Sequence, residues 1–323
     1  MIGEKEKKVP SWSKSEWHGF LLIHKEVGPT SHDTVNGLRN ILTYRKIGHT
    51  GTLDPAACGL LLTCLGRGCK IVQFLNQWDK EYRATIKLGE ETDTYDAQGK
   101  IIKVTDNLNL DEDKIEKAIL SFKGEQWQLS PSYAAVKFEG KKLYEYAREG
   151  KDVPKKMKRI KIKHVQVEKI DLPFVNIKVT CSSGTYIRSL AYDIGKKLGC
   201  GAYLFSLCRT RVGPFELKEA LSLERVKKEK DKISDFFVKI ENVLKYLPSL
   251  VIKDHFKEGI KNGVDLKPAH IDSVEKYFNK GDKIVLKDES GEILAIGDSF
   301  VSSEKLFDNQ NQKKIFKYRR VLF

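Results

Sequence analysis

The stretch GHTGTLDPAACGLLLTCLGRGCK, residues 48–70, decides the fold of this chain, because it joins a glycine-rich loop to a long apolar run. The glycines let the loop backbone approach a ligand closely. Asp54 stands at the end of the loop, directly before Pro55. We expect an apolar helix from about Pro55 to Leu65, so that Asp54 lies at a junction between loop and helix.

Residue chemistry alone leaves four interpretations of Asp54 open. An aspartate N-cap followed by proline at the first helical position is a common structural arrangement. A phosphate-binding loop would need a terminal Gly-Lys-Ser/Thr, which is missing here. A metal site of His49, Asp54 and Cys58 has no recognised spacing. The fourth interpretation is a catalytic carboxylate, which the loop chemistry by itself does not favour over the cap.

Patterns on both sides of this loop predict an α/β fold of the α+β type. Strands are expected at Phe20–His24, Tyr82–Leu88, Ile160–Val167 and Val175–Cys181, and helices over 35–42, Asp111–Phe122 and Ile187–Leu198. These elements interleave without regular βαβ units. We therefore expect a mixed, largely antiparallel central sheet flanked by helices.

The residue pattern of the sequence changes after Leu247-Pro248. Short alternating segments are separated there by NKGD, DESGE and DNQNQ turns, which is typical of a small β-rich domain. We predict a disordered lead at 1–18, a main domain at 19–247 and a second domain at 248–323.

The charge of the chain favours a polyanionic partner. The 58 Lys and Arg residues exceed the 44 Asp and Glu residues, for a net charge of +14. Residues 141–163 alone hold ten basic and three acidic side chains. Such a concentration suits nucleic acid, because each neutralised phosphate releases condensed counterions. A solvated lysine-rich surface is the other interpretation.

The apolar and cysteine content argue against a membrane or secreted protein. No stretch reaches the roughly 18 consecutive apolar residues of a membrane span. The six cysteines form no CxxC pair and no paired framework. We expect reduced thiols in a cytoplasmic protein.

Two further segments carry candidate site residues. Tyr82 lies in KEYRA (80–84), ahead of an acidic turn that ends at Asp96. It is either a core aromatic or a platform for stacking a base. Arg188 lies in SGTYIRSL (183–190), on an expected helix whose apolar residues Ile187 and Leu190 face inward. It is either a surface residue or an arginine turned inward to pair with a carboxylate.

The sequence resembles the TruB family of pseudouridine synthases in several separate blocks that follow the family's order. GHTGTLDPAACGLLLTCLGRGCK carries the family's G-x-L-D-P element. The other blocks are KEYRATIKLGEETDTYDAQG, SPSYAAVKFEGKKLYEYAREG, SSGTYIRSLAYDIGKKLGCGA and LCRTRVGPF. SPSYAAVKFEGKKLYEYAREG is similar to the tRNA-modifying branch rather than to the relatives guided by RNA. The region after Val251 resembles, more weakly, a PUA RNA-binding domain.

The resemblance implies a role for each of seven residues. Asp54 is the expected catalytic carboxylate, paired with Arg188, and Asp96 lies close to the base and to that arginine. Tyr82 stacks on the flipped base, while Tyr186 and Leu207 complete the pocket. His49 enters the RNA loop and fills the space that the extruded uridine leaves.

The first motif departs from the family pattern. Where the family usually has Lys-Pro-x-Gly, this chain has Lys25-Glu26-Val27-Gly28. The motif is expected to be structural, since in the family it packs beneath the catalytic loop.

The resemblance further implies isomerisation of the T-loop uridine at position 55 of tRNA, with an RNA-binding insertion at about 125–160. The reaction involves no redox change and no atoms enter or leave, so we expect neither a cofactor nor a metal. We expect a monomer that binds the T-arm without a guide RNA or an obligate protein partner. A silent RNA-binding protein and a guided sibling enzyme are the two alternatives.

Overall fold

The structure is a computed structural model, and it describes residues 17–106, 108–131, 137–138, 141–142, 157–308 and 314–323. Nearly all of the predicted disordered lead at 1–18 lies outside these residues. So does most of the predicted insertion at about 125–160. No helix in the described ranges is long and apolar enough to cross a membrane.

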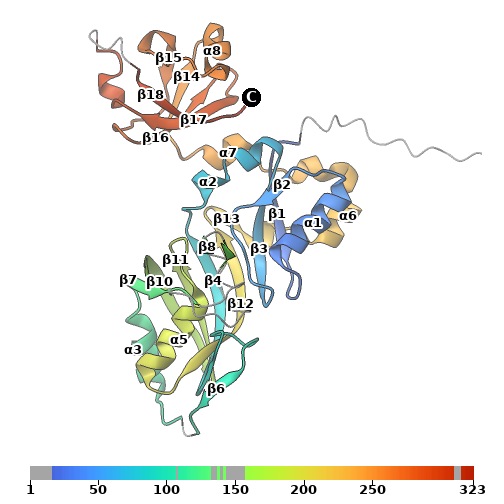
Figure 1. The fold of residues 1–323 in the computed structure, drawn as a ribbon, viewed down its shortest axis with the longest axis vertical. Helices are drawn as coiled ribbons and strands as arrows, with labels where there is room; N and C mark the ends of the chain where they lie inside the picture. Colours follow the sequence, from blue (N-terminus) through green and yellow to red (C-terminus); the bar gives the residue numbers. More distant parts are fainter. Residues whose placement is uncertain (1–16, 107, 132–136, 139–140, 143–156, 309–313) are drawn as a thin grey trace, which may run out of the picture.

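The described part of the chain forms two main sheets (Figure 1), and the larger one has nine strands. Its order is β1 (Gly19–Lys25), β3 (Ala57–Leu65), β12 (Ala202–Val212), β4 (Lys80–Leu88), β11 (Phe174–Cys181), β10 (Met157–Asp171) and β7 (Gly124–Leu129). Two short strands, β2 (Ile47–His49) and β13 (Phe215–Glu216), pair with β3 and β12. Within this sheet the pairing of β3 with β12 is parallel and the other pairings are antiparallel. The predicted mixed, largely antiparallel sheet is confirmed.

The predicted helix from Pro55 to Leu65 is wrong, because this segment is strand β3. Strand β3 pairs with β1, β2 and β12, and its residues are almost all buried. A short apolar run that is buried on both faces has no polar positions, so its periodicity cannot separate helix from strand. Asp54 is consequently not a helix N-cap.

The helices cover the large sheet and bury its apolar residues. Helix α1 (Ser31–Leu42) starts with a capping box between Thr30 and Asp33 and packs on α6 (Leu223–Lys228). Helix α5 (Ile187–Leu198) ends at Gly199 in the left-handed conformation, and α3 (Glu112–Leu120) packs beside it. Ile86, Ile177 and Ile194 are fully buried in the core between α5, α3 and the sheet.

The remaining elements of this part are short. They comprise α2 (Val72–Leu75), α7 (Ile240–Leu244), β5 (Glu90–Thr92), β6 (Ile101–Val104), β8 (Lys137–Phe138), β9 (Lys141–Lys142), and the 3-10 helices η1 (Gly66–Lys70), η2 (Leu217–Glu219) and η3 (Lys230–Phe236).

A small β-rich unit follows, as its turn pattern predicted. Its five strands lie in the order β15 (Ile271–Val274), β14 (Ser249–Ile252), β16 (Lys283–Lys287), β17 (Ile293–Ser299) and β18 (Phe316–Val321). Helix α8 (Lys257–Lys261) and the 3-10 helices η4 (Asp254–Phe256), η5 (Pro268–His270) and η6 (Ser303–Lys305) complete it. It has a core of its own, in which Ile252, Leu286 and Phe316 are fully buried.

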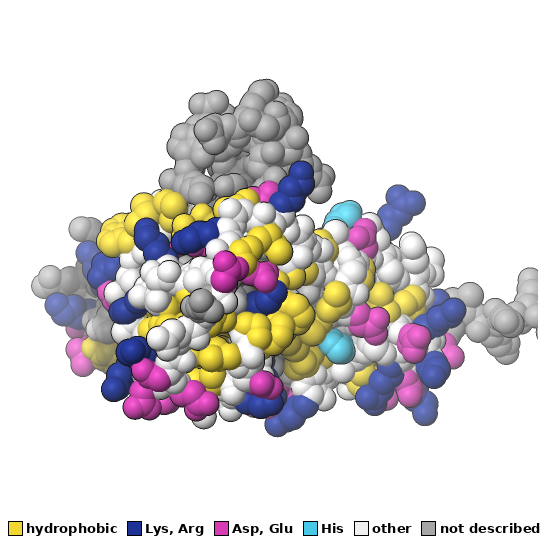
Figure 2. Space-filling model, turned by 90° about the horizontal axis from the view of Figure 1, so that it is seen from below, with side chains coloured by type: hydrophobic (Ala, Val, Ile, Leu, Met, Phe, Trp, Pro, Cys, Tyr) yellow, Lys and Arg dark blue, Asp and Glu magenta, His cyan; other side chains and the backbone are white. Residues whose placement is uncertain are grey.

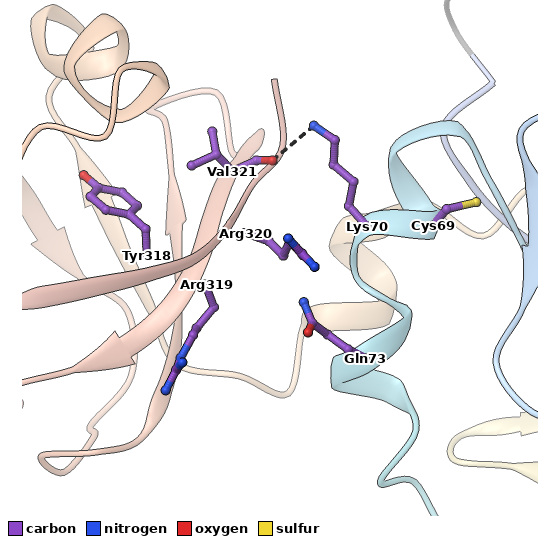
Figure 3. A pocket seen from close by; sticks show the side chains of 7 residues that line it. All are labelled: Cys69, Lys70, Gln73, Tyr318, Arg319, Arg320 and Val321. Atoms are coloured by element: carbon purple, nitrogen blue, oxygen red, sulfur yellow. Dashed lines mark hydrogen bonds between the residues drawn. The ribbon is translucent and has the colours of Figure 1, made fainter. Parts of the chain in front are cut away.

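The C-terminal sheet is held against η1, and we call this contact region the domain junction (Figure 3). Arg67 Nη1 lies 2.8 Å from Glu292 Oε1 and 3.4 Å from the Leu322 carbonyl oxygen. Lys70 Nζ donates to the Val321 carbonyl at 3.1 Å. Most of these bonds end on main-chain oxygens of the last strand and of the residues after it. A cavity of about 590 Å³ lies beside them.

The parallel contact of β3 with β12 depends on a glycine. Gly59 stands opposite Arg209 with a φ of +114°, and a Cβ there would overlap the backbone nitrogen and oxygen of Arg209. Gly124 has a similar φ of +120° but open space where a Cβ would be. An alanine at either position would strain the backbone, but only an alanine at Gly59 would also overlap other atoms. Comparing the two substitutions therefore separates the cost of strain from the cost of overlap.

We predict that Gly59→Ala lowers the free energy of unfolding much more than Gly124→Ala does. Backbone strain costs each variant about 1–3 kcal/mol. Gly59→Ala adds an overlap worth roughly another 1–3 kcal/mol. Urea denaturation of the two variants and the parent measures the difference. Equal losses would mean that the two strands can separate at no cost.

Candidate active site

A cavity of about 430 Å³ opens where the loop at 50–54 faces strands β4 and β12 and the start of α5. Its volume lies in the range of ligand pockets. Of the seven predicted site residues, five line it: Asp54, Tyr82, Tyr186, Arg188 and Leu207. Asp96 and His49 do not.

Arg188 joins the two aspartates of the site. Its Nε lies 3.1 Å from Asp54 Oδ2 and its Nη1 lies 3.2 Å from Asp96 Oδ2. The side chains of Arg188 and Asp96 are 7% and 9% exposed, whereas that of Asp54 is 45% exposed. A buried arginine needs such partners because an unpaired buried charge is costly. Of the two interpretations of Arg188, the structure shows the arginine turned inward and paired with carboxylates.

Asp96 sits behind the arginine rather than in the cavity. Its Oδ1 accepts hydrogen bonds from Thr94 Oγ1 at 2.6 Å and from the Gln98 amide at 3.1 Å. Its other oxygen faces Arg188. Asp96 therefore fixes the guanidinium from the inside, and Asp54 is the carboxylate that faces open space.

The main chain around Asp54 is held from three sides. Ser31 Oγ, at the start of α1, donates to the Leu53 carbonyl at 3.0 Å and accepts from the Leu53 amide at 2.8 Å. Arg209, which is 2% exposed, donates to the carbonyls of Gly51 at 3.0 Å and Thr52 at 3.3 Å. These bonds fix the main chain from which the Asp54 side chain extends.

Lys25 supplies a further set of hydrogen bonds to the main chain near Asp54. Its buried Nζ donates to the carbonyls of Ala57 at 2.6 Å and Glu26 at 2.9 Å, and the Gly28 amide donates to Pro55 at 2.9 Å. The first motif thus lies beneath the loop that carries Asp54, as expected. Glu26 is exposed, so a glutamate in place of the family's usual proline leaves these contacts intact.

Two aromatic residues and a leucine form the apolar part of the cavity. Tyr82 lies on β4 between Arg209 on β12 and Val179 on β11. Tyr186 precedes α5, where its backbone exchanges two hydrogen bonds with the Gln128 side chain. Burial raises the pKa of both phenols. Both therefore remain neutral and suited to stacking.

His49 ends β2, at the start of the loop that carries Asp54. Its half-buried ring accepts a hydrogen bond from the Gly51 amide at Nδ1, 3.2 Å away. Burial, with the positive charge of Arg209, lowers the pKa of His49. The imidazole is therefore neutral at pH 7.

Sequence reasoning gave no role to Arg209 or Lys80. Arg209 lies in the segment LCRTRVGPF, but its side chain donates hydrogen bonds to the backbone of a loop far away in the sequence. No residue pattern reveals such a contact. Lys80 opens strand β4 and lines the cavity, and its Nζ donates to the carbonyls of Trp78 at 2.6 Å and Asn76 at 2.9 Å. Burial, then the charge of Arg209, lowers the pKa of Lys80 to about 8.

The described ranges contain no group of three or more His, Cys, Asp and Glu side chains arranged to hold a metal.

Three family models match successive parts of the chain. The family model for the N-terminal domain of TruB family pseudouridylate synthases matches residues 39–187. The models for the tRNA pseudouridylate synthase B C-terminal domain and for the PUA domain match residues 188–246 and 248–322.

Curated relatives and solved structures agree with the family models. The tRNA pseudouridine synthase B of Thermotoga maritima is 37% identical, over 94% of this chain and 98% of its own. That of Clostridium tetani is 43% identical, over 79% of this chain and 87% of its own. A crystal structure of a Cbf5–Nop10–Gar1 complex superimposes with a TM-score of 0.75 at 27% identity, over 98% of this chain and 91% of the other.

The nine-stranded sheet with its aspartate-bearing loop defines the class as a pseudouridine synthase with a β-rich C-terminal domain. The curated relatives identify the family within this class. The chain belongs to the TruB family of pseudouridylate synthases.

We predict that Lys80 makes stability depend on pH. Its folded pKa, about 8, lies below the ordinary 10.5. Between these values the unfolded chain binds a proton that the folded chain does not, so raising the pH favours the folded state. The unfolding free energy of the parent, minus that of Lys80→Met, should therefore rise from about pH 8 to pH 10. Urea denaturation across this range measures it, and a flat difference would contradict the perturbed lysine.

Proposed function

We propose that this chain is a tRNA pseudouridine synthase that isomerises the T-loop uridine at position 55, with Asp54 as the catalytic carboxylate. The observation that carries the proposal is the Arg188 bridge. It holds a half-exposed Asp54 at the mouth of a tyrosine-lined cavity, while Asp96 occupies its other side. The names of the relatives agree with this substrate.

The cavity has the parts that a flipped base requires. Extruding a base costs a few kcal/mol, which stacking and hydrogen bonds in the pocket can offset. Stacking on an aromatic such as Tyr82 contributes about 1–3 kcal/mol. Tyr186 and Leu207 bound the same space. The N1–C1′ bond must break, and the uracil must then rotate and rejoin C1′ through C5 without drifting away, so an apolar wall around the base suits the reaction.

Asp54 has the freedom and the support that this reaction demands. Its side chain faces the cavity, while the bonds from Ser31, Lys25 and Arg209 hold the backbone around it. Arg188 supplies the counter-charge and fixes the carboxylate's orientation. This arrangement suits attack at C1′, attack at C6 and removal of the 2′ proton equally.

Positive side chains near the cavity supply the electrostatic attraction for RNA. Lys80 and Lys158 line it, and Arg209 lies at its base. On the face seen in Figure 2, basic side chains are interspersed with acidic ones. The basic side chains that line the cavity attract a phosphate backbone to it.

We further propose that the chain acts in the cytoplasm as a monomer, without a guide RNA or an obligate protein partner. Its six cysteines are free thiols, which suits a reducing compartment. A guided enzyme is the second candidate, since a similar solved structure is an H/ACA RNP bound to a substrate RNA. That structure covers 96% of this chain at 25% identity, with a TM-score of 0.74.

The purified chain should convert the uridine in a T-arm hairpin by itself. Pseudouridine mapping after reaction reads out the product. A guided enzyme would leave the hairpin unmodified, and a silent RNA-binding protein would bind it without conversion. Either result would overturn the proposal.

We predict that Asp54→Asn abolishes turnover while folding and RNA affinity survive. The amide is nearly isosteric but cannot serve as a nucleophile or base. Asp93→Asn is the matched control, because Asp93 is an exposed carboxylate that accepts from the Lys100 amide outside the cavity. Multiple-turnover assays and RNA titrations compare the two variants. Sustained turnover by Asp54→Asn would refute the catalytic role.

We predict that His49→Ala reduces activity more on a structured T-arm than on a short open oligomer with the same uridine. A neutral imidazole beside the loop suits a filler of the gap left by the base, and flipping costs least in an unstructured strand. A loss of about tenfold or more on the T-arm corresponds to roughly 1.4 kcal/mol.

The measurement is the ratio of kcat/KM on the two substrates, with His32→Ala, an exposed histidine of α1, as control. Equal losses on both substrates would argue against this role. An altered pH profile would instead assign His49 to proton transfer.

A further inference from the structure

Two cysteines lie together behind the domain junction, and neither takes part in the proposed reaction. Cys64, near the end of β3, is 1% exposed, and Cys69 in η1 is half-buried. The Cys69 thiol donates a hydrogen bond to the Cys64 carbonyl oxygen, which lies 3.3 Å from its Sγ. A Cβ on Gly48 would meet the sulfurs at 3.2 and 4.0 Å, so the glycine leaves room for the pair.

The surroundings of Cys69 favour its thiolate. The hydrogen bond from Cys64, then the positive charges of Lys46 and Arg39, lower the pKa of Cys69 to about 7, although burial acts to raise it. The same hydrogen bond raises the pKa of Cys64 well above its usual range. Tyr44 is a further titratable neighbour. At neutral pH the pair therefore holds one reactive thiolate beside one thiol.

Cys69 is half-buried and lies beside the cavity at the domain junction. Cys69 is among the residues that line that cavity, together with Lys70, Gln73 and Arg320. Figure 3 shows the Cys69 side chain on η1 with its sulfur directed away from β18, toward its own domain. The Cys69 thiol also lies 3.6 Å from the Lys46 carbonyl oxygen in an exposed contact, so a small oxidant can reach the sulfur from that side.

We propose that Cys64 and Cys69 are a peroxide-reactive thiol pair that closes to a disulfide behind the domain junction. The Cys69 thiolate attacks one oxygen of hydrogen peroxide, the O–O bond breaks, and the leaving hydroxide takes a proton to become water. The Cys64 sulfur then attacks the resulting Cys69 sulfenic acid. An S–S bond forms, the S–O bond breaks, and water leaves with the Cys64 proton. Two thiols are oxidised and one peroxide is reduced to two waters.

Closing this bond acts on the residues that anchor the C-terminal domain. The ring from Cys64 to Cys69 contains Arg67, and Lys70 follows it directly. These two side chains make the bonds to Glu292, Val321 and Leu322. Forming the S–S bond ties η1 to the end of β3 and restricts the backbone that carries these two side chains. Oxidation should therefore weaken the junction.

A second cysteine pair in the chain serves as a matched control. Cys58 and Cys208 stand opposite each other on the parallel strands β3 and β12, and both line a cavity of about 320 Å³. Burial and the neighbouring thiol raise the pKa of Cys208 to about 12. This pair is also adjacent in the fold, but the Cys208 thiol is not ionised at neutral pH.

The test treats the full chain with stoichiometric hydrogen peroxide, blocks free thiols with N-ethylmaleimide and maps the peptides by mass. We expect a Cys64–Cys69 disulfide, with Cys58 and Cys208 still reduced. Cys64→Ser should stop at a sulfenic acid on Cys69 that dimedone traps. Cys69→Ser should consume no peroxide at this site, and Cys58→Ser/Cys208→Ser should behave as the parent.

The pH dependence of alkylation adds a measurement that needs no variant. The rate of Cys69 modification by iodoacetamide should rise through a midpoint near pH 7. A midpoint in the ordinary thiol range, a disulfide that forms first between Cys58 and Cys208, or a Cys64–Cys69 pair that stays reduced would each overturn the proposal. Limited proteolysis should cut the oxidised form faster near 247, and equal cutting rates would overturn the effect on the junction.

Discussion

The arrangement of the site depends on the burial of one guanidinium group. Arg188 enters the protein at the first turn of α5 and must find opposite charge there, since an unpaired buried charge is costly. Asp96 meets it from the loop after β5, and Asp54 from the loop before β3. Three segments far apart in the sequence are therefore brought to one point by a single side chain. Asp54, the proposed catalytic carboxylate, is the partner that keeps access to solvent.

The loop around Asp54 shows how rigidity is obtained without regular structure. Its carbonyls and amides are bound by Ser31 from α1, Lys25 from β1 and Arg209 from β12. Two of these three donors are buried cations that bind main-chain oxygens. Such bonds demand little of the loop's own side chains, which leaves its glycines and threonine available for contact with a ligand.

Much of the architecture could be predicted from residue patterns, for physical reasons. Strands with one face to the core, such as β10, and amphipathic helices, such as α5, leave a period in the sequence. Strand β3 could not be assigned this way, because it is covered on both faces and has no period to read. The resemblance of sequence blocks supplied the site residues that the structure brings together around Arg188. The roles of Arg209 and Lys80 were out of reach, because their partners are backbone atoms whose positions only the fold determines.

The bonds at the domain junction have a consequence for how this chain can change over evolution. Lys70 and Arg67 bind carbonyl oxygens of Val321 and Leu322, which every amino acid offers. These bonds do not depend on the side chains of Val321 and Leu322, although Leu322 is also held by its burial in the core. An inserted or deleted residue within β18 is another matter, because it would change the strand register and carry the acceptors past their donors. The last strand is thus constrained in register by its main-chain contacts, beyond what its side chains require.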